Sequence, residues 1–230
     1  MRYCRLPLPR SAGFTIVEMS VVLVVIALIV GAVSIGRDVY RAAAAERISS
    51  DFVQGWVLAY DRYVAAVGTA PNDDFDNPTG QVNGGPSNFL CRDELQNAML
   101  GAGVALPSGR GEGFSNAYVF QDSRGIPHEL EVCFGNVQWS EPHASVGNYQ
   151  TRARNVMRLQ GMTPELATLL DNKADGRVDA RHGRFREAGE QDDTTALGLP
   201  WSALETENFN GGNDPDAQVA EMTGYLRMSQ

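Results

Sequence analysis

The hydrophobic pattern of the chain begins with one long apolar run from Phe14 to Ile35. The clearly polar side chains within this run belong to Thr15, Glu18, Ser20 and Ser34. A helix that crosses the hydrocarbon core of a bilayer needs about 20 consecutive apolar residues, and the run has this length. The pattern therefore predicts a membrane-spanning helix that contains one carboxylate.

The residues beyond Gly36 continue with an amphipathic pattern. From Asp38 to Val67 there is no proline, and large apolar residues recur at steps of three and four, which places them on one helix face. These residues are Phe52, Trp56, Tyr60, Tyr63 and Val67. A continuous helix over Phe14 to Val67 has 54 residues and a length of about 80 Å. We expect its second half to lie under a globular head, with the aromatic face in the core.

Two shorter helices are predicted beyond the loop of residues 68–86, which is rich in Gly, Pro, Asn and Asp. Ser87 is a plausible N-cap for the first, and Gly101 a plausible stop. Its apolar face is expected to contain Leu90, Leu95, Ala98 and Met99. The second helix is expected to begin with Thr163 as cap and Pro164 in its first turn, and to end near Gly176.

Short β-prone runs indicate a sheet between Ala117 and Ser140. The runs are 117–120, 130–134 and 137–139, and the last two are separated by Gly135-Asn136, a two-residue hairpin signal. This order predicts an antiparallel meander that packs on the aromatic face of the long helix. The fold class is therefore α+β, with a long and partly transmembrane N-terminal helix against an antiparallel sheet.

Glu18 is the anomalous residue of the apolar run. An ionisable group at membrane depth costs about 2.5 to 3.5 kcal/mol on insertion scales, so we expect it to have a partner there. Cleavage of the chain after Gly13 would leave an ammonium group on Phe14, which has the right sign and depth to be that partner.

The arrangement of Gly13, Phe14, Thr15 and Glu18 behind a short basic leader resembles the type III signal sequence of type IV pilins and type II secretion pseudopilins. This resemblance implies that a prepilin peptidase cleaves between Gly13 and Phe14, and that Phe14 is then N-methylated. It also implies helical assembly with other pilin subunits by an inner-membrane assembly platform. In such filaments Glu18 would meet the Phe14 ammonium of a neighbouring subunit.

The resemblance also implies a division of the chain and a pilin-like fold. The leader would comprise residues 1–13, and the transmembrane or filament-core helix residues 14–36. Residues 37–67 would continue that helix, and residues 68–230 would form the globular head. The precursor is expected in the inner membrane with its head outside the cytoplasm, and the mature protein in an extracellular pilus or a periplasmic pseudopilus.

Two other kinds of N-terminal segment are alternatives to a prepilin-type signal. An ordinary secretory signal has its small residues after the apolar region, whereas Ser11-Ala12-Gly13 lies before it. A plain signal anchor, with Glu18 near the cytoplasmic interface, remains as the second alternative. It predicts that the leader is retained and that Glu18 is dispensable.

The charge balance of the chain disfavours nucleic acid as a partner. There are 19 Lys and Arg against 28 Asp and Glu, a formal charge of -9. Residues 1–13 carry Arg2, Arg5 and Arg10 and no acid, so their removal gives 16 minus 28, or -12. Binding of phosphates relies on clustered basic residues, and we expect an acidic, exported head without such a function.

The cysteine pattern fits an oxidising compartment. Cys4 would leave with the leader, so Cys91 and Cys133 remain as an even pair in the exported part. A disulfide between them would close a loop of about 43 residues, worth about 4 kcal/mol in the chain-entropy model. The alternative is a pair of buried free thiols.

Residues 170–176 resemble a Leu-Asp-x-Lys-x-Asp-Gly segment in the heads of some large pilin-like proteins, which favours a minor pilin. Asp171, Asp175 and Asp179 are also the weak candidates for a calcium site, because they fall at ligand positions of an EF-hand-like loop. Lys173 and His182 occupy positions that require oxygen ligands, so no cofactor or metal is favoured. The preferred interpretation is a helix-ending turn in which Asp175 and Asp179 pair with Arg177, Arg181 or Arg184.

No catalytic motif is apparent. His128, His143 and His182 lack metal-ligand spacing, and no Gly-x-Ser-x-Gly sequence is present. We therefore expect a non-enzymatic structural subunit of a type IV pilus or related filament, with a minor pilin as the favoured role. The alternative within the family is a type II secretion pseudopilin. The alternative of another class is a signal-anchored enzyme or ligand-binding domain.

Overall fold

The computed structural model describes residues 13–86, 88–111, 115–145, 147–195, 197–212, 214 and 216–229. It divides into two compact units, residues 1–42 and residues 43–230. Most of the predicted leader and the predicted cap Ser87 lie outside the described residues. The first unit contains the apolar part of the N-terminal helix, and the second contains the head.

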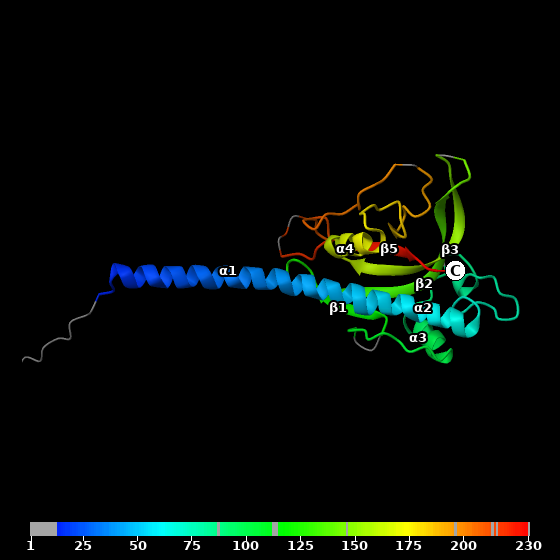
Figure 1. Cartoon of the computed structure of the whole chain (residues 1–230), viewed down its shortest axis with the longest axis horizontal. Coiled ribbons are helices and arrows are strands. Elements are labelled where there is room, and N and C mark those ends of the chain that lie inside the picture. The colour runs from blue at the N-terminus through cyan, green and yellow to red at the C-terminus, as the bar shows by residue number, and fades with distance from the viewer. Residues whose placement is uncertain are drawn as a thin grey trace, which may run out of the picture. The chain divides into compact units, whose positions relative to one another are not determined.

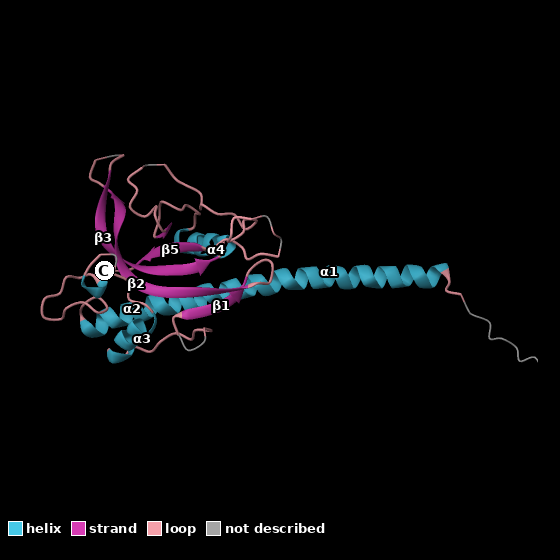
Figure 2. Cartoon of the chain, turned by 180° about the vertical axis from the view of Figure 1, so that it is seen from behind, coloured by secondary structure: helices cyan, strands magenta, loops and turns pink. Residues whose placement is uncertain are grey.

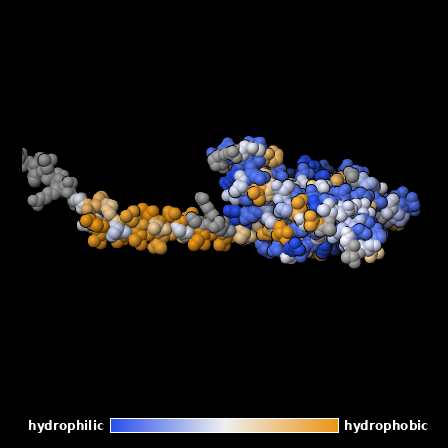
Figure 3. All heavy atoms as spheres, turned by 90° about the horizontal axis from the view of Figure 1, so that it is seen from above, coloured by the Kyte–Doolittle hydropathy of each residue, from blue (hydrophilic) through white to orange (hydrophobic). Residues whose placement is uncertain are grey.

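The predicted membrane segment is helical. Helix α1 (Ile16–Arg47) has 32 residues and continues without interruption through Gly31 and Gly36. Its window Ile16–Val33 has a mean hydropathy of 2.9, and none of the window is buried. Figure 3 shows hydrophobic side chains over this part of the helix. By length and composition it is able to cross a membrane.

Helical structure continues from α1 into the head, but not regularly. Residues Ile48–Val53 form a π-helical segment, and α2 (Gln54–Val67) follows it. Gly68 ends α2 with a φ of 85°, in the left-handed conformation that favours glycine at this position. The aromatic stripe predicted from the sequence is buried: Phe52 and Trp56 are fully inaccessible, and Tyr60 and Tyr63 nearly so.

The head contains one antiparallel sheet of five strands (Figures 1 and 2). The strands are β1 (Ala117–Gln121), β2 (Pro127–Pro142), β3 (Tyr149–Met162), β4 (Phe185–Glu187) and β5 (Met222–Arg227). Their order across the sheet is β1-β2-β3-β5-β4. The sheet with its helices confirms the α+β class.

The hairpin predicted at Gly135-Asn136 is wrong. Both residues lie inside β2, which pairs with β3 over twelve consecutive partners from Glu131 to Pro142. Local turn propensity is overridden here by tertiary contacts. The ring of Phe89 fills the space that a side chain at Gly135 would need, and the Asn136 amide donates to Asn155 Oδ1 at 2.8 Å. The connection between β2 and β3 is instead made by residues 143–148.

The core lies between α2 and one face of the sheet. The ring centroids of Trp56 and Tyr60 are 6.0 and 5.1 Å from that of Phe134 on β2, both in edge-on geometry. Figure 1 shows α2 running beside β2. Leu130, Met157 and Leu159 complete the same cluster and are fully buried. The predicted packing of an antiparallel sheet on the aromatic helix face is thus confirmed, although two of the three runs assigned to the meander, 130–134 and 137–139, form the single strand β2.

Helix α3 (Arg92–Gly101) ends where predicted but begins later. Cys91 is its N-terminal flanking residue, and Leu90 lies before the helix, where it forms an isolated bridge with Phe134. The Leu90 side chain is buried in the main core, but the residue precedes the helix. Its assignment to the apolar face of the helix is therefore wrong. Leu95 and Met99 are the buried residues of α3.

Helix α4 (Pro164–Asp175) agrees with the sequence at both ends. The Thr163 hydroxyl accepts a hydrogen bond from the Leu166 N–H at 3.3 Å, Pro164 opens the helix, and Gly176 closes it with a φ of 72°. The helix contacts β4 and β5, and its Leu166 and Leu170 enter the main core.

Candidate processing and assembly site

The peptide bond between Gly13 and Phe14 lies in an exposed segment that precedes the helix. Residues 13–15 have no regular secondary structure, and α1 begins at Ile16. The side chain of Phe14 is 81% exposed. A protease can therefore reach this bond without unwinding any helical turn.

Thr15 and Glu18 form a capping box at the start of α1. The Glu18 carboxylate accepts hydrogen bonds from the Thr15 N–H at 2.8 Å and from its hydroxyl at 3.0 Å. In return, the Glu18 N–H donates to Thr15 Oγ1 at 3.2 Å. Two backbone donors that the first helical turn leaves without partners are satisfied in this way.

The capping box gives Glu18 a structural role that the sequence interpretation missed, although the Thr-x-x-Glu spacing signals it. The two roles are compatible, because a carboxylate can accept more than two hydrogen bonds. Glu18 is held next to the Thr15 N–H, one residue beyond the bond at Phe14. Its charge therefore lies close to the terminus that cleavage would create.

Cys91 and Cys133 form a disulfide bond in the structure, with Cα atoms 4.6 Å apart. The bond ties the start of α3 to β2. Arg158 on β3 lies beside it, and its Nη2 is 3.4 and 3.3 Å from the two sulfur atoms. Together with Glu131, the two cysteines are a group whose ligand atoms lie close enough for a metal, but sulfur atoms in a disulfide are not metal ligands.

The three calcium candidates bind backbone N–H groups of the segment that follows α4. Asp171 Oδ2 accepts from the Asp179 N–H and from Trp201 Nε1, both at 2.8 Å. Asp175 accepts from the backbone of Arg184 and Phe185 at 2.8 to 3.0 Å. With these bonds the carboxylates fold the segment back on the helix.

The prediction that Asp175 and Asp179 pair with arginine side chains is wrong, because both carboxylates bind backbone N–H groups instead. Asp179 Oδ1 accepts from the backbone N–H groups of Arg181, His182 and Leu199 at 3.0 to 3.2 Å. The Arg181 guanidinium instead forms ion pairs with Glu190 at 2.7 Å and Asp193 at 3.0 Å. The turn is thus stabilised by hydrogen bonds from backbone N–H groups. The sequence alone does not indicate which N–H groups a carboxylate will bind.

Asp171 is the most deeply buried of the three acids. Its side chain is inaccessible, and its Oδ1 has no hydrogen-bond partner. Burial raises the pKa of this carboxyl to about 6, although the bonds from Trp201 and Asp179 act in the opposite direction.

His128 belongs to a buried cluster that sequence reasoning missed. Its Nε2 lies 3.0 Å from Asp122 Oδ2 and its Nδ1 lies 3.2 Å from Glu221 Oε1. Asp122 also accepts from the N–H groups of Arg124, Ile126 and Val219, so the cluster joins the β1–β2 turn to the segment before β5. The group has no hydroxyl or thiol in these contacts, and its bonds are those of a structural clamp.

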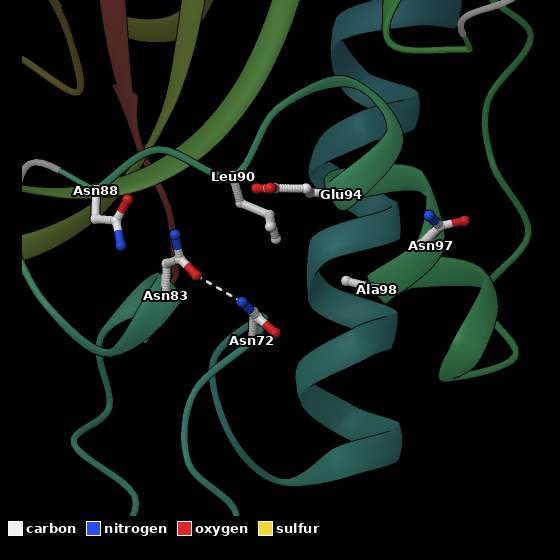
Figure 4. A pocket seen from close by; sticks show the side chains of 7 residues that line it. All are labelled: Asn72, Asn83, Asn88, Leu90, Glu94, Asn97 and Ala98. Atoms are coloured by element: carbon white, nitrogen blue, oxygen red, sulfur yellow. Dashed lines mark hydrogen bonds between the residues drawn. The ribbon is translucent and has the colours of Figure 1, made fainter.

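A polar pocket of about 550 Å³ lies between the loop after α2 and the helix α3 (Figure 4). It is lined by Asn72, Asn83, Asn88, Leu90, Glu94, Asn97 and Ala98. The Asn72 amide donates to Asn83 Oδ1 at 2.5 Å across its wall. Amides and a single carboxylate offer hydrogen bonds to water or a small polar molecule, but no pair of groups suited to acid–base or nucleophilic catalysis.

Comparison with known proteins gives one family match, and it covers the N-terminal segment of the chain. Residues 8–34 match the family described as prokaryotic N-terminal methylation motif, and the match includes Gly13, Phe14 and Glu18. No curated protein and no solved structure matches the chain. The segment at the start of α1 is therefore the prepilin-type cleavage and methylation signal of type IV pilin-like proteins.

Proposed function

We propose that the chain is a structural subunit of a type IV pilus or a related filament. The observation that carries this proposal is the position of Glu18, a carboxylate at the start of an exposed apolar helix and within the signal for cleavage and methylation. In an isolated membrane anchor, the capping box alone would have to offset the cost of a charge at this depth. A filament core can in addition use the charge as a partner for an ammonium group.

The proposed sequence of events centres on residues 13–18. Cleavage by prepilin peptidase after Gly13 converts the Phe14 nitrogen into an ammonium group. Glu18 of a subunit already in the filament then supplies the counter-charge for the Phe14 ammonium of the next one. In an apolar surround, the loss of one member of such a pair costs about 3 to 5 kcal/mol, because the other charge is left buried alone.

The experiment must separate the charge of Glu18 from its role as a cap. Glu18→Gln keeps an acceptor for the Thr15 N–H, as in capping boxes that use Gln, but removes the charge. Thr15→Val removes the hydroxyl and leaves the charge. We expect both variants to be inserted and cleaved, and Glu18→Gln alone to be strongly depleted from sheared filaments relative to the wild type.

The opposite pattern would contradict the proposal. If Glu18→Gln is incorporated like the wild type while Thr15→Val is depleted, Glu18 serves the helix only as a cap. A chain that retains its leader in the wild type would favour a plain signal anchor instead.

A further inference from the structure

The sheet face opposite α2 carries an unusual concentration of arginines for so acidic a chain. Antiparallel partners share a face, and Phe134 and Met157 point to the core, so their strand neighbours point away from it. The arginines on this outer face, here called the arginine face, are Arg152, Arg154, Arg158, Arg184, Arg186 and Arg227. They come from β3, β5 and the β4 region, which are adjacent only in the folded sheet.

Acidic side chains neutralise the arginine face only in part. Glu141 pairs with Arg154 at 2.6 Å and with Arg227 at 3.0 Å, and Glu131 lies at its edge. Arg186 is buried, and its guanidinium donates to the carbonyls of Gly183, Ser140 and Gln191, so its charge is not available to a partner. Among the described residues, the other five arginines against the two glutamates leave a local charge of about +3 within a chain of formal charge -9. Arg152 and Arg184 are exposed to solvent.

Aromatic rings lie among these arginines. Phe89 and Tyr225 stack with centroids 5.9 Å apart and an interplanar angle of 9°. The Arg158 guanidinium lies 4.3 Å from the Phe89 centroid. Both rings are half-buried, so the face can receive an aromatic side chain as well as carboxylates.

The chain itself contains an exposed segment that combines carboxylates with an aromatic side chain. The loop Asp73–Asp76, here called the acidic loop, has the sequence Asp-Asp-Phe-Asp, and its Phe75 is 73% exposed. The loop is held in shape from within: Asp73 accepts from Thr79 Oγ1 at 2.8 Å and the Gly80 N–H at 2.7 Å. Asp74 accepts from the Asp76 N–H at 2.9 Å. The loop therefore presents a phenylalanine between carboxylates at little cost in conformational entropy.

We propose that the acidic loop of one copy docks on the arginine face of the next copy. The two surfaces are different, so the contact is heterologous and repeats from copy to copy as an open filament requires. This inference rests on the proposed function and names a contact between heads. A long polyanion is the competing occupant, and the net negative charge of the whole chain opposes it.

Cysteine pairs test the contact directly in cells that assemble the full chain. Copies with Phe75→Cys and copies with Arg152→Cys are produced together, with either variant alone as control. We expect a cross-linked dimer under oxidising conditions only when both are present, and a ladder of multimers when one chain carries both. Dimers that need only one of the two cysteines would overturn the proposed pairing.

Charge reversal supplies the second test. Asp76→Lys and Arg152→Glu should each lower incorporation into filaments about tenfold, and the double variant should recover most of it, because the charges again attract. Asp93→Lys on α3 and Arg62→Glu on α2 change exposed residues by the same charge and serve as controls. Equal losses in these controls, or no recovery in the double variant, would contradict the inference.

Failure of the inference differs from failure of the proposed function. If the wild type is cleaved and forms filaments but Asp76→Lys is incorporated equally well, only the head contact is wrong. If the wild type forms no filament, the proposed function itself is wrong. Binding of a labelled single-stranded oligonucleotide that Arg152→Glu abolishes, with filaments unaffected, would overturn the inference in favour of a polyanion.

Discussion

Asp171 is the residue whose burial gives the head a pH dependence. Its pKa is 3.8 without the fold and about 6 within it, so the fold favours the neutral carboxyl. The contribution of this group to stability is complete below pH 3.8 and is lost as the pH rises through about 6. At neutral pH the head therefore keeps a buried charge with one unpartnered oxygen.

Asp171→Asn should stabilise the purified chain at pH 7 by about 1 to 2 kcal/mol. The amide is neutral, and its oxygen can still accept from Trp201 and the Asp179 N–H. The advantage over the wild type should shrink below pH 6 and vanish near pH 4, where the wild-type carboxyl is protonated. Denaturant unfolding at a series of pH values measures this, and an advantage that is constant with pH would contradict the assigned cause.

At the scale of single elements, β3 depends on one glycine. The pairing of β3 with β5 shifts register between Gln160 and Met162, and Gly161 between them has a φ of 84°. A Cβ at this position would fall on the carbonyl oxygen of Glu129 on the neighbouring strand. The bulge therefore needs glycine for its conformation and for the close approach of the two backbones.

Gly161→Ala should destabilise the head by about 2 to 4 kcal/mol, since strain at positive φ adds to overpacking against a backbone atom. Gly125 in the β1–β2 turn has the same φ of 84° but open space around it, so Gly125→Ala should cost only about 1 kcal/mol. Thermal or denaturant unfolding compares the two variants. Similar losses in both would mean that the contact with Glu129 contributes nothing.

The disulfide joins two elements, α3 and β2, that are distant in sequence. Peptide mapping of envelope-derived protein without reductant should recover Cys91 and Cys133 in one linked pair. The double substitution Cys91→Ser with Cys133→Ser should lower the free energy of unfolding by about 4 kcal/mol, because the open loop regains conformational entropy in the unfolded chain. Two free thiols in the native protein would refute this prediction.

Elements whose signals are local could be predicted from the sequence. The α4 boundaries follow from Thr163, Pro164 and Gly176, and the buried stripe of α2 follows from its periodicity. The course of β2 could not be predicted, because Gly135-Asn136 is a turn signal until Phe89 and Asn155 contact it. The capping role of Glu18 could have been predicted from the Thr-x-x-Glu spacing. The His128 clamp and the arginine face could not, because their prediction requires the order and register of the strands.

At the scale of the whole molecule, the prepilin-type signal predicts that the mature chain differs from the encoded one. Removal of residues 1–13 takes away three arginines and no acid, which changes the formal charge from -9 to -12. The intact mass of the native protein should correspond to residues 14–230 with one added methyl group. Substitution of Gly13 tests whether cleavage depends on the residue before Phe14.

Gly13→Leu should leave an uncut precursor without methylation in the membrane fraction. A Cβ at Gly13 meets no atom within 4 Å, and the residue lies in an exposed segment before the helix, so we expect the substitution to leave the folded chain undisturbed. A loss of cleavage must then reflect the peptidase, which has to accept residue 13 beside the bond it breaks. Gly31→Ala is the matched control, because Gly31 has equally open surroundings within α1 and lies well beyond the bond. Intact masses of both variants decide the matter: normal processing of Gly13→Leu, or a cleavage defect in Gly31→Ala, would contradict a peptidase that recognises the glycine before Phe14.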